Sequence, residues 1–369
     1  MGFKQCEMEN LVNRKYLESK FANKKVLVTG HTGFKGSWLI CLLQQLKANV
    51  VGYALKPDKP ENLYDIINDD HKICTSIIHD IRDKERFKNE LLEIQPDFIF
   101  HLAAQPLVRY SYEEPIETFQ VNVMGTAYLL EALRSLEKKC SVIIVTTDKV
   151  YQNKETLMAY CEDDNLGGYD PYSSSKAMAE LLTISYRDSY FNVDSIKTHN
   201  KGIATARAGN VIGGGDWSKD RIVTDIVAAL NAKSKVKVRN PDAVRPWQFV
   251  LEPLLGYLLL AARMDDDPVK YIGAWNFGPL PDDQLTVAGL VKKAISAWGE
   301  GSMEIANDVQ NVHEAGLLRL NITKANNLLS WKPLLNSELA IQWTIEWYRQ
   351  NVNDRKKFTY QQIEQYLSL

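Results

Sequence analysis

Short apolar runs alternate with stretches of helical periodicity through the first half of the chain. The apolar runs are rich in β-branched residues and lie at 25–29, 50–54, 75–79, 98–102 and 142–146. Helical patterns separate them, for example at 36–46, 84–92 and 122–136. Strands that are apolar along their whole length are covered on both faces, and helices between them imply parallel pairing. The pattern therefore predicts an α/β fold with a doubly wound parallel sheet.

The pattern changes after about residue 206. A glycine-rich break at 213–217 precedes a helical pattern at 222–232 and a short strand at 236–238, which predicts a smaller, mainly helical second domain. The division that we predict is an N-terminal extension (1–23), a sheet domain (24–206, with returning segments near 240–255 and 272–280), an interleaved second domain (207–350) and a C-terminal tail (351–369). We expect both terminal segments to be peripheral helices.

Composition narrows the class of protein. Of 369 residues, 45% are hydrophobic and 24% are charged, as in ordinary soluble globular proteins, and the net charge is −2. So small a charge argues against non-specific binding to nucleic acid or to a membrane surface. The five scattered cysteines lack CxxC spacing, which favours reduced thiols in a cytoplasmic protein over disulfides or a metal site. The longest apolar stretch, around 254–262, is too short to span a bilayer.

Three glycines follow the first predicted strand and open the first predicted helix. Gly30, Gly33 and Gly36 have the spacing G-x-x-G-x-x-G. In this position glycines provide a tight turn, a close approach to a pyrophosphate and close helix packing, with the phosphates at the positive end of the helix. The same residues could form a simple turn, but their place at the start of a βαβ series favours a dinucleotide site.

The second predicted strand lacks an element that such sites usually have. A carboxylate near the end of this strand commonly binds the ribose hydroxyls. Residues 51–56 contain none and end in Lys56, which is either a solvated surface charge or a sign of weaker affinity or of tolerance for a 2′-phosphate. Asp80, after the third strand, is placed to contact the adenine.

Two further motifs carry candidate acid–base chemistry. Tyr172 and Lys176 lie one helical turn apart, after an Asp-Pro pair that starts helices well. A nearby ammonium favours the phenolate and would lower the tyrosine pKa, so that the tyrosine can act as a base. Thr147, Asp148 and Lys149 follow a strand at the carboxyl edge of the sheet, where a carboxylate and an amine form an acid–base pair. A cap, a turn and a solvated lysine are the structural alternatives.

The motifs also occur in a characteristic order. Thr-Gly-His-Thr-Gly-Phe-Lys-Gly lies at 29–36, His-Asp-Ile-Arg-Asp at 79–83, His-Leu-Ala-Ala-Gln at 101–105, Asn-Val-x-Gly-Thr at 122–126, Thr-Thr-Asp-Lys-Val-Tyr at 146–151 and Tyr-x-x-x-Lys at 172–176. This order resembles the extended short-chain dehydrogenase/reductase family, which has a Rossmann-like fold, and more narrowly its nucleotide-sugar 4,6-dehydratases. The motifs at 105–112, 207–217, 245–254 and 275–279 resemble most the dehydratases that act on CDP-glucose. The resemblance covers about residues 24 to 350.

The resemblance implies NAD as the cofactor, a nucleotide sugar (CDP-glucose) as the substrate, and a homo-oligomer, either a dimer or a tetramer. The residues implied to bind the cofactor are Gly30, His31, Thr32, Gly33, Phe34, Lys35, Gly36, Asp80, Ile81, Leu102, Ala103, Ala104, Gln105, Tyr172 and Lys176. The residues implied to bind the substrate are Arg109, Ser111, Tyr112, Asn210, Arg221, Arg245 and Arg319. Arginine suits this role because its guanidinium forms bidentate contacts with phosphate. His31 is expected beside the pyrophosphate, where it would loosen the cofactor.

The implied reaction uses Thr147, Asp148, Lys149, Tyr172 and Lys176. Tyr172 takes the proton of the sugar C4 hydroxyl, water leaves from C6 with Asp148 as the acid, and the product is a 4-dehydro-6-deoxy sugar. The chain departs from the dTDP-glucose dehydratases at Lys149, where those proteins carry a glutamate that removes the C5 proton, so the identity of the base is open. The alternatives are a dehydratase for dTDP- or GDP-sugars, a nucleotide-sugar 4-epimerase, and a non-catalytic dinucleotide-sensing protein.

Overall fold

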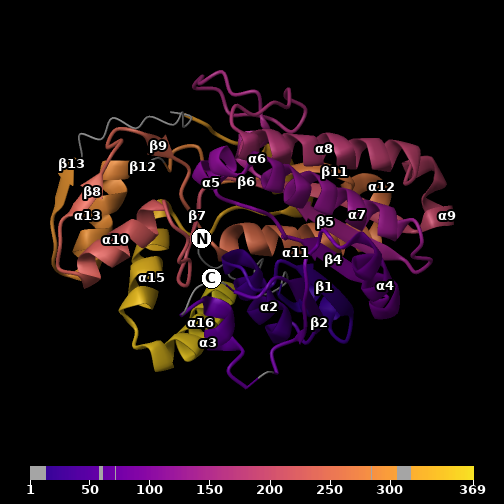
Figure 1. The fold of residues 1–369 in the computed structure, drawn as a ribbon, viewed down its shortest axis with the longest axis horizontal. Helices are drawn as coiled ribbons and strands as arrows, with labels where there is room; N and C mark the ends of the chain where they lie inside the picture. The colour runs from indigo at the N-terminus through magenta and orange to yellow at the C-terminus, as the bar shows by residue number, and fades with distance from the viewer. Residues whose placement is uncertain (1–13, 58–60, 71, 284, 306–316) are drawn as a thin grey trace, which may run out of the picture.

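The computed structural model describes residues 14–57, 61–70, 72–283, 285–305 and 317–369. Its centre is a seven-stranded parallel sheet with the order β11-β6-β5-β4-β1-β2-β3 (Figure 1). The strands are β1 (Lys25–Thr29), β2 (Asn49–Ala54), β3 (Thr75–Ile78), β4 (Phe98–His101), β5 (Cys140–Val145), β6 (Lys201–Ala208) and β11 (Gly273–Phe277). The predicted doubly wound parallel sheet is confirmed.

Helices cover both faces of this sheet. On one face lie α4 (Lys84–Ile94), α7 (Gly125–Leu133) and α8 (Pro171–Ser189); on the other lie α2 (Phe34–Gln45) and α11 (Leu251–Asp266). Alternate strand residues enter the two cores: Val26 and Val28 pack with α2 and α11, whereas Leu27 packs with α4 and α7. This alternation explains why apolar residues follow one another in β1 and do not alternate with polar ones.

The helical pattern predicted at 122–136 is part of a longer run. It consists of α6 (Pro115–Phe119), a π-helical turn η1 (Gln120–Met124) and then α7. The run begins earlier than the apolar periodicity shows, because Pro115 occupies the first helical position. π-helical turns inside longer helices occur frequently at functional sites, and this one carries Asn122 toward the carboxyl edge of the sheet.

A smaller region packs beside the carboxyl edge of the sheet (Figure 1). It contains α10 (Ile222–Asn231), α13 (Val287–Trp298), α15 (Ser337–Arg349) and the strand pairs β7 (Val211–Ile212) with β10 (Gln248–Phe249), β9 (Val244–Arg245) with β12 (Leu285–Thr286), and β8 (Val236–Val238) with β13 (Met303–Ile305). The helix α14 (Thr323–Leu329) packs against α11 and β11 of the sheet domain. The chain returns to the sheet domain through α11 and β11, and β6 continues two residues beyond the predicted boundary at 206.

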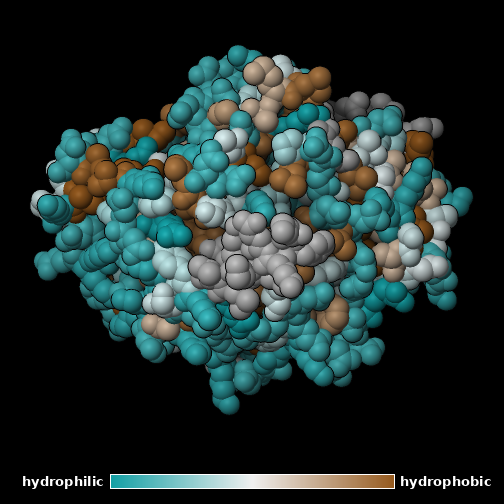
Figure 2. All heavy atoms as spheres, turned by 180° about the vertical axis from the view of Figure 1, so that it is seen from behind, coloured by the Kyte–Doolittle hydropathy of each residue, from teal (hydrophilic) through white to brown (hydrophobic). Residues whose placement is uncertain are grey.

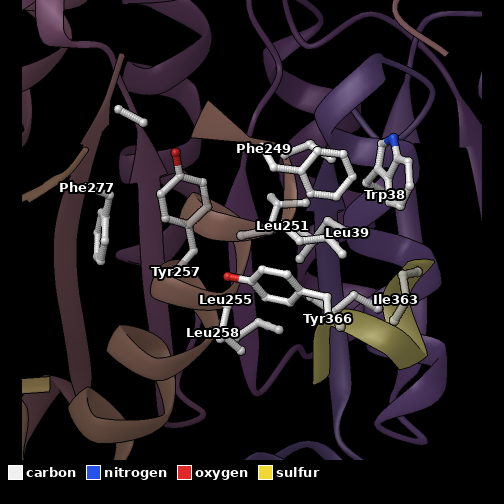
Figure 3. Packing of buried hydrophobic residues seen from close by; sticks show 14 of the residues in the cluster. Trp38, Leu39, Phe249, Leu251, Leu255, Tyr257, Leu258, Phe277, Ile363 and Tyr366 are labelled. Carbon is white, nitrogen blue, oxygen red and sulfur yellow. The ribbon is translucent and has the colours of Figure 1, made fainter. Parts of the chain in front are cut away.

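Both terminal segments contain helices, as predicted, but the described part of each packs into the core and is not peripheral. Residues 14–21 form a helix in which Leu17 and Phe21 are fully buried, and the Phe21 ring lies 4.6 Å from that of Phe98. At the other end, α16 (Val352–Ser368) buries Ile363 and Tyr366 against α2 and α11 (Figure 3). The tail reads as charged and solvated in the sequence because only a narrow stripe of it is apolar. Residues 1–13 lie outside the described part of the chain.

Hydrophilic residues cover most of the face seen in Figure 2, and hydrophobic residues lie in smaller groups between them. Within the described residues, none of the helices is both long and apolar enough to cross a bilayer.

A buried carboxylate joins α11 to the C-terminal segment. The Glu252 carboxylate accepts hydrogen bonds from the Leu334 and Leu335 amides, at 3.0 and 2.7 Å, and from the Tyr366 hydroxyl at 2.7 Å. Burial nevertheless raises the pKa of Glu252 to about 7, because desolvation of the charged form outweighs these three donors.

This raised pKa predicts a pH-dependent stability. The folded protein holds the Glu252 proton more tightly than the unfolded chain, so stability falls as the pH rises from about 4.5 toward 7 and is constant above that. The difference amounts to about 3 kcal/mol. In Glu252→Gln, this part of the difference in unfolding free energy between pH 5 and pH 8, measured with urea, should disappear. If the difference stays as in the unmodified protein, other groups cause the pH dependence.

Candidate functional site

A cavity of about 2090 Å³ opens at the carboxyl edge of the sheet. Its walls come from the glycine turn, the ends of β2 to β6, the start of α8 and the smaller region. In doubly wound sheets, ligands bind at this edge where the strand order reverses, which here is between β1 and β4. The cavity is larger than the 300–1,000 Å³ or so of typical small-molecule sites, so two ligands can share it.

The glycine turn is built for a close backbone approach. Gly30 has a left-handed φ of 75°, and a Cβ atom there would lie 2.7 Å from the amide nitrogen of Ala103. A Cβ atom on Gly36 would lie 2.1 Å from the Gly30 carbonyl oxygen. Gly33 caps α2 and faces the cavity, so the amino end of the helix points into it. This is the geometry of a pyrophosphate site.

Of the other residues in the turn, Thr32, Phe34 and Lys35 line the cavity. Burial, together with the positive charges of Arg221 and Lys176, lowers the pKa of Lys35 to about 7. Lys35 therefore lies within electrostatic reach of both the predicted cofactor side and the predicted substrate side of the cavity.

His31 does not lie beside the pyrophosphate position. Its ring is fully buried on the other side of the turn, where Nε2 lies 2.7 Å from the Ser76 hydroxyl and the ring meets the edge of Tyr64. The ring also fills the space above Gly52, and burial lowers the pKa of His31 to about 4. His31 is a neutral packing residue, so the expectation that it loosens the cofactor was wrong.

The part of the cavity predicted to hold the adenosine is lined by Asp80, Ile81 and residues 102–104, as expected. The Asp80 carboxylate binds the Arg82 guanidinium at 2.6 Å, which holds the pKa of Asp80 below its usual range. The end of β2 contributes Tyr53, Ala54 and Leu55 to the wall.

Gln105 does not line the cavity. Its side chain bonds the Leu107 backbone and donates to the Thr118 hydroxyl at 2.8 Å. Asn122 completes this arrangement, because it accepts from the Gln105 amide at 2.8 Å and donates to the Ser175 hydroxyl at 2.8 Å. Asn122 thus ties the loop after β4 to the helix that carries Tyr172. The 122–126 motif contained the signal for this role, but Asn122 was not among the predicted site residues.

The predicted catalytic residues come together at the centre of the cavity. Thr147 hydrogen-bonds the Tyr172 phenol, and its hydroxyl lies 3.0 Å from the Asp148 carboxylate. The Asp148 side chain is 2% exposed and lies 3.6 Å from the Lys149 ammonium. The Ser111 hydroxyl accepts from the Tyr172 amide at 3.1 Å, which fixes the start of α8. An acid, an amine and a phenol therefore face the same space.

Lys176 is buried below this group and donates to the Val145 carbonyl at 3.1 Å. Burial lowers the pKa of Lys176 to about 8, while the Glu180 carboxylate opposes this shift. The pKa of Tyr172 is raised by burial, and Lys149, Thr147 and Arg221 act against the rise. The expectation of a net lowered tyrosine pKa was wrong for the protein without ligands, and the cation that acts most strongly on Tyr172 is Lys149.

A family model described as GDP-mannose 4,6 dehydratase matches residues 27–344. The chain belongs to this family. The CDP-glucose 4,6-dehydratase of Salmonella typhimurium is 44% identical over 328 residues, covering 88% of this chain and 90% of that protein. The dTDP-glucose 4,6-dehydratase 1 of Escherichia coli is 26% identical and covers 92% and 98%. The relationship to nucleotide-sugar 4,6-dehydratases that the motifs predicted is confirmed.

Solved structures agree on the fold of this 4,6-dehydratase family member. The dTDP-glucose 4,6-dehydratase of Bacillus anthracis in complex with NAD has a TM-score of 0.73 at 22% identity, covering 91% of this chain and 99% of that one. The UDP-glucose 4-epimerase of Thermotoga maritima with UDP-glucose also has a TM-score of 0.73, at 20% identity, covering 88% and 98%. Dehydratases and epimerases share this scaffold, so the site has to distinguish them.

The predicted substrate residues of this dehydratase family member divide into two groups. Arg109, Asn210, Arg221 and Arg245 line the cavity, and Arg221 is held by the Asp216 carboxylate at 2.6 Å. Ser111, Tyr112 and Arg319 do not line it. Ser111 is buried beneath Tyr172, Tyr112 is 40% exposed, and the Arg319 guanidinium lies 3.5 Å from the Leu157 carbonyl.

Several cavity residues were missed in the sequence. They are charged side chains of the smaller region: Asp216, Lys219, Asp220, Asp225, Lys237 and Arg239. Asp216 belongs to the motif at 207–217, and the other five lie before, within and after α10, outside the motifs. Among the described residues there is no cluster of three or more His, Cys, Asp or Glu side chains that could hold a metal ion.

Proposed function

We propose that this protein dehydrates CDP-glucose to CDP-4-dehydro-6-deoxy-glucose with NAD as its cofactor. We place the reaction in the cytoplasm, in deoxysugar synthesis for lipopolysaccharide O-antigen. The observation that carries the proposal is the joint occurrence of Thr147, Asp148 and Lys149 with Tyr172 in one cavity, in a chain 44% identical to a CDP-glucose 4,6-dehydratase.

The glycine turn fits a dinucleotide. Side chains at Gly30 and Gly36 would fill the turn, and the amino end of α2 faces the cavity. Residues 30–36, 80–81 and 102–104 would hold the cofactor. When bound, NAD would supply a hydride acceptor for oxidation at the sugar C4 and, once reduced, the hydride donor for C6.

The protein's own residues then move the protons. Tyr172, hydrogen-bonded to Thr147, removes the proton of the C4 hydroxyl, and the nearby Lys149 charge favours the charged form of the phenol. Asp148 donates a proton to the departing C6 hydroxyl. Its carboxylate faces the cavity beside Thr147 and Lys149, which is the position that this acid requires.

An epimerase is the second candidate, because the fold and the Tyr172–Lys176 pair suit both reactions. Epimerisation at C4 requires no acid for a leaving hydroxyl. A buried carboxylate beside Tyr172 therefore favours dehydration.

We also propose that the protein forms a homo-oligomer. Ile116 on α6, Met124 on η1 and Met178 on α8 are 68%, 42% and 45% exposed, on elements that pack against one another. An apolar surface of this kind is typical of a face covered by a second copy. Analytical ultracentrifugation should show a dimer or tetramer, and Met178→Glu should shift it toward the monomer.

The test of the function is a panel of CDP-, dTDP-, UDP- and GDP-glucose incubated with the protein and NAD. CDP-glucose should lose one water to give a 4-dehydro-6-deoxy product, detected by mass spectrometry, faster than the other three. Turnover of dTDP-glucose at an equal or higher rate would contradict cytosine as the nucleobase of the substrate. Inversion of configuration at C4 without loss of water would establish an epimerase.

Lys149→Met tests the C5 base. If the Lys149 amine removes this proton, deuterium exchange at C5 in D₂O and dehydration should both fall, by roughly 10²–10⁴. Lys154→Met, an exposed lysine nearby, should leave both rates unchanged. Normal C5 exchange in Lys149→Met would assign the base to another residue.

A further inference from the structure

The phenol and the acid of the site come from different elements of the fold. Tyr172 lies on α8, whereas Asp148 and its neighbours follow β5, in the turn η2 (Asp148–Val150). Lys176, one helical turn after Tyr172, already joins the two elements, because it donates to the Val145 carbonyl at the end of β5. The proposed reaction uses the phenol and the carboxylate on one sugar, so the placement of α8 relative to this turn has to be fixed.

A buried ion pair also joins α8 to the sheet. The side chains of Glu180 on α8 and Arg207 on β6 are 1% and 2% exposed. The guanidinium donates from Nε and Nη2 to the two carboxylate oxygens, each at 3.0 Å. The hydroxyls of Thr146 and Thr205 donate to the same carboxylate at 2.5 and 2.7 Å. The Glu180 carboxylate is therefore held in one orientation.

This pair is bonded to both ends of the segment that carries the predicted acid–base residues. Thr146, which donates to Glu180, lies directly before that segment. Tyr151 lies directly after η2, and its hydroxyl accepts from Arg207 at 2.8 Å. Residues 147–150 are thus fixed on both sides by one ion pair, and the carboxylate of that pair comes from the helix that bears the phenol.

The pair is a poor source of stability. Removing two charges from water costs about as much free energy as their attraction returns, and apolar residues of similar volume often stabilise a core as well or better. The residues that the pair holds in place explain it better than the stability that it provides.

We propose that the Glu180–Arg207 ion pair is a positioning element that holds the segment 147–149 at both ends. It thereby fixes the Asp148 carboxylate relative to the Tyr172 phenol. Its importance for turnover rests on the proposed function.

The first test removes both charges together, because either single change leaves a lone buried charge that can prevent folding. In Glu180→Gln/Arg207→Met, kcat with CDP-glucose and NAD should fall by roughly 10²-fold, the cost of a small misplacement of reacting groups. The KM for CDP-glucose should stay nearly the same, because Arg221 and Arg245, which are predicted to bind the substrate, lie on other segments. Glu252→Gln changes an equally buried carboxylate that does not line the cavity, and it should keep both constants.

Two threonines offer a matched pair of milder variants. Thr146→Val and Thr205→Val each remove one hydroxyl that donates to Glu180, but only Thr146 adjoins the catalytic segment. Thr146→Val should lower kcat by about tenfold, whereas Thr205→Val should leave it unchanged. Hydrogen–deuterium exchange of the whole protein without ligands should rise in residues 146–151 in Thr146→Val and in the double variant, but not in Thr205→Val.

An unchanged kcat in the double variant would overturn the inference, whatever the effect on stability. An equal rise of exchange throughout the sheet domain would overturn it too, because it indicates a general loss of stability. If the double variant does not fold, equal values of kcat in Thr146→Val and Thr205→Val would have the same meaning. Faster exchange confined to residues 146–151, in a protein that does not dehydrate CDP-glucose, would uphold the positioning role and contradict the proposed reaction.

Discussion

Asp148→Asn should slow water loss by roughly 10²–10⁴, the usual contribution of a general acid, while the first oxidation continues. An amide preserves the size of the side chain beside Thr147 and Lys149 but cannot donate the proton that the departing C6 hydroxyl needs. A single turnover in D₂O should therefore accumulate the absorbance of reduced nicotinamide and a 4-dehydro sugar that still has its C6 hydroxyl.

The control for this variant is Asp188→Asn, an exposed carboxylate on α8. It makes the same chemical change at a residue that does not line the cavity and should behave like the unmodified protein. Dehydration at the normal rate in Asp148→Asn would remove Asp148 from the mechanism.

Tyr172→Phe should stop the reaction one step earlier, with a loss of similar size. Without the phenol, the C4 hydroxyl keeps its proton, so neither reduced nicotinamide nor C5 deuterium exchange should appear. Tyr190→Phe, a half-exposed tyrosine at the end of the same helix, is the matched control. Reduced nicotinamide in Tyr172→Phe would show that another group accepts the C4 proton.

Four of the strands that the sequence predicted share a composition that β6 lacks. β1, β2, β4 and β5 are rich in valine, isoleucine and phenylalanine, which signal a buried strand even in isolation. β6 reads Lys-Gly-Ile-Ala-Thr-Ala-Arg-Ala and gives no such signal, yet all of its residues are buried. It is a strand because β5 and β11 lie on either side of it, which is tertiary information.

In the site, the sequence predicted which residues lie at the edge of the sheet, but not the direction of every side chain. The motifs placed the glycine turn, Asp148 and Tyr172 at one edge, because the carboxyl ends of parallel strands meet there. They could not show that His31 points away from the cavity or that Gln105 bonds its own loop. The charged residues around Arg239 come from segments far apart in the sequence, so only the folded chain brings them to the cavity.

The placement of α16 has a consequence for synthesis. This last helix covers α2, the first helix after β1, and Tyr366 reaches the Glu252 carboxylate in α11. All the other strands of the sheet lie between α2 and α16 along the chain, so the earliest β-α unit acquires this covering layer only after the whole sheet has been synthesised. Until then the sheet domain is incompletely packed on this face. A chain that stops before Tyr366 would leave Glu252 with one partner fewer, and such a product should be recognised readily by proteases.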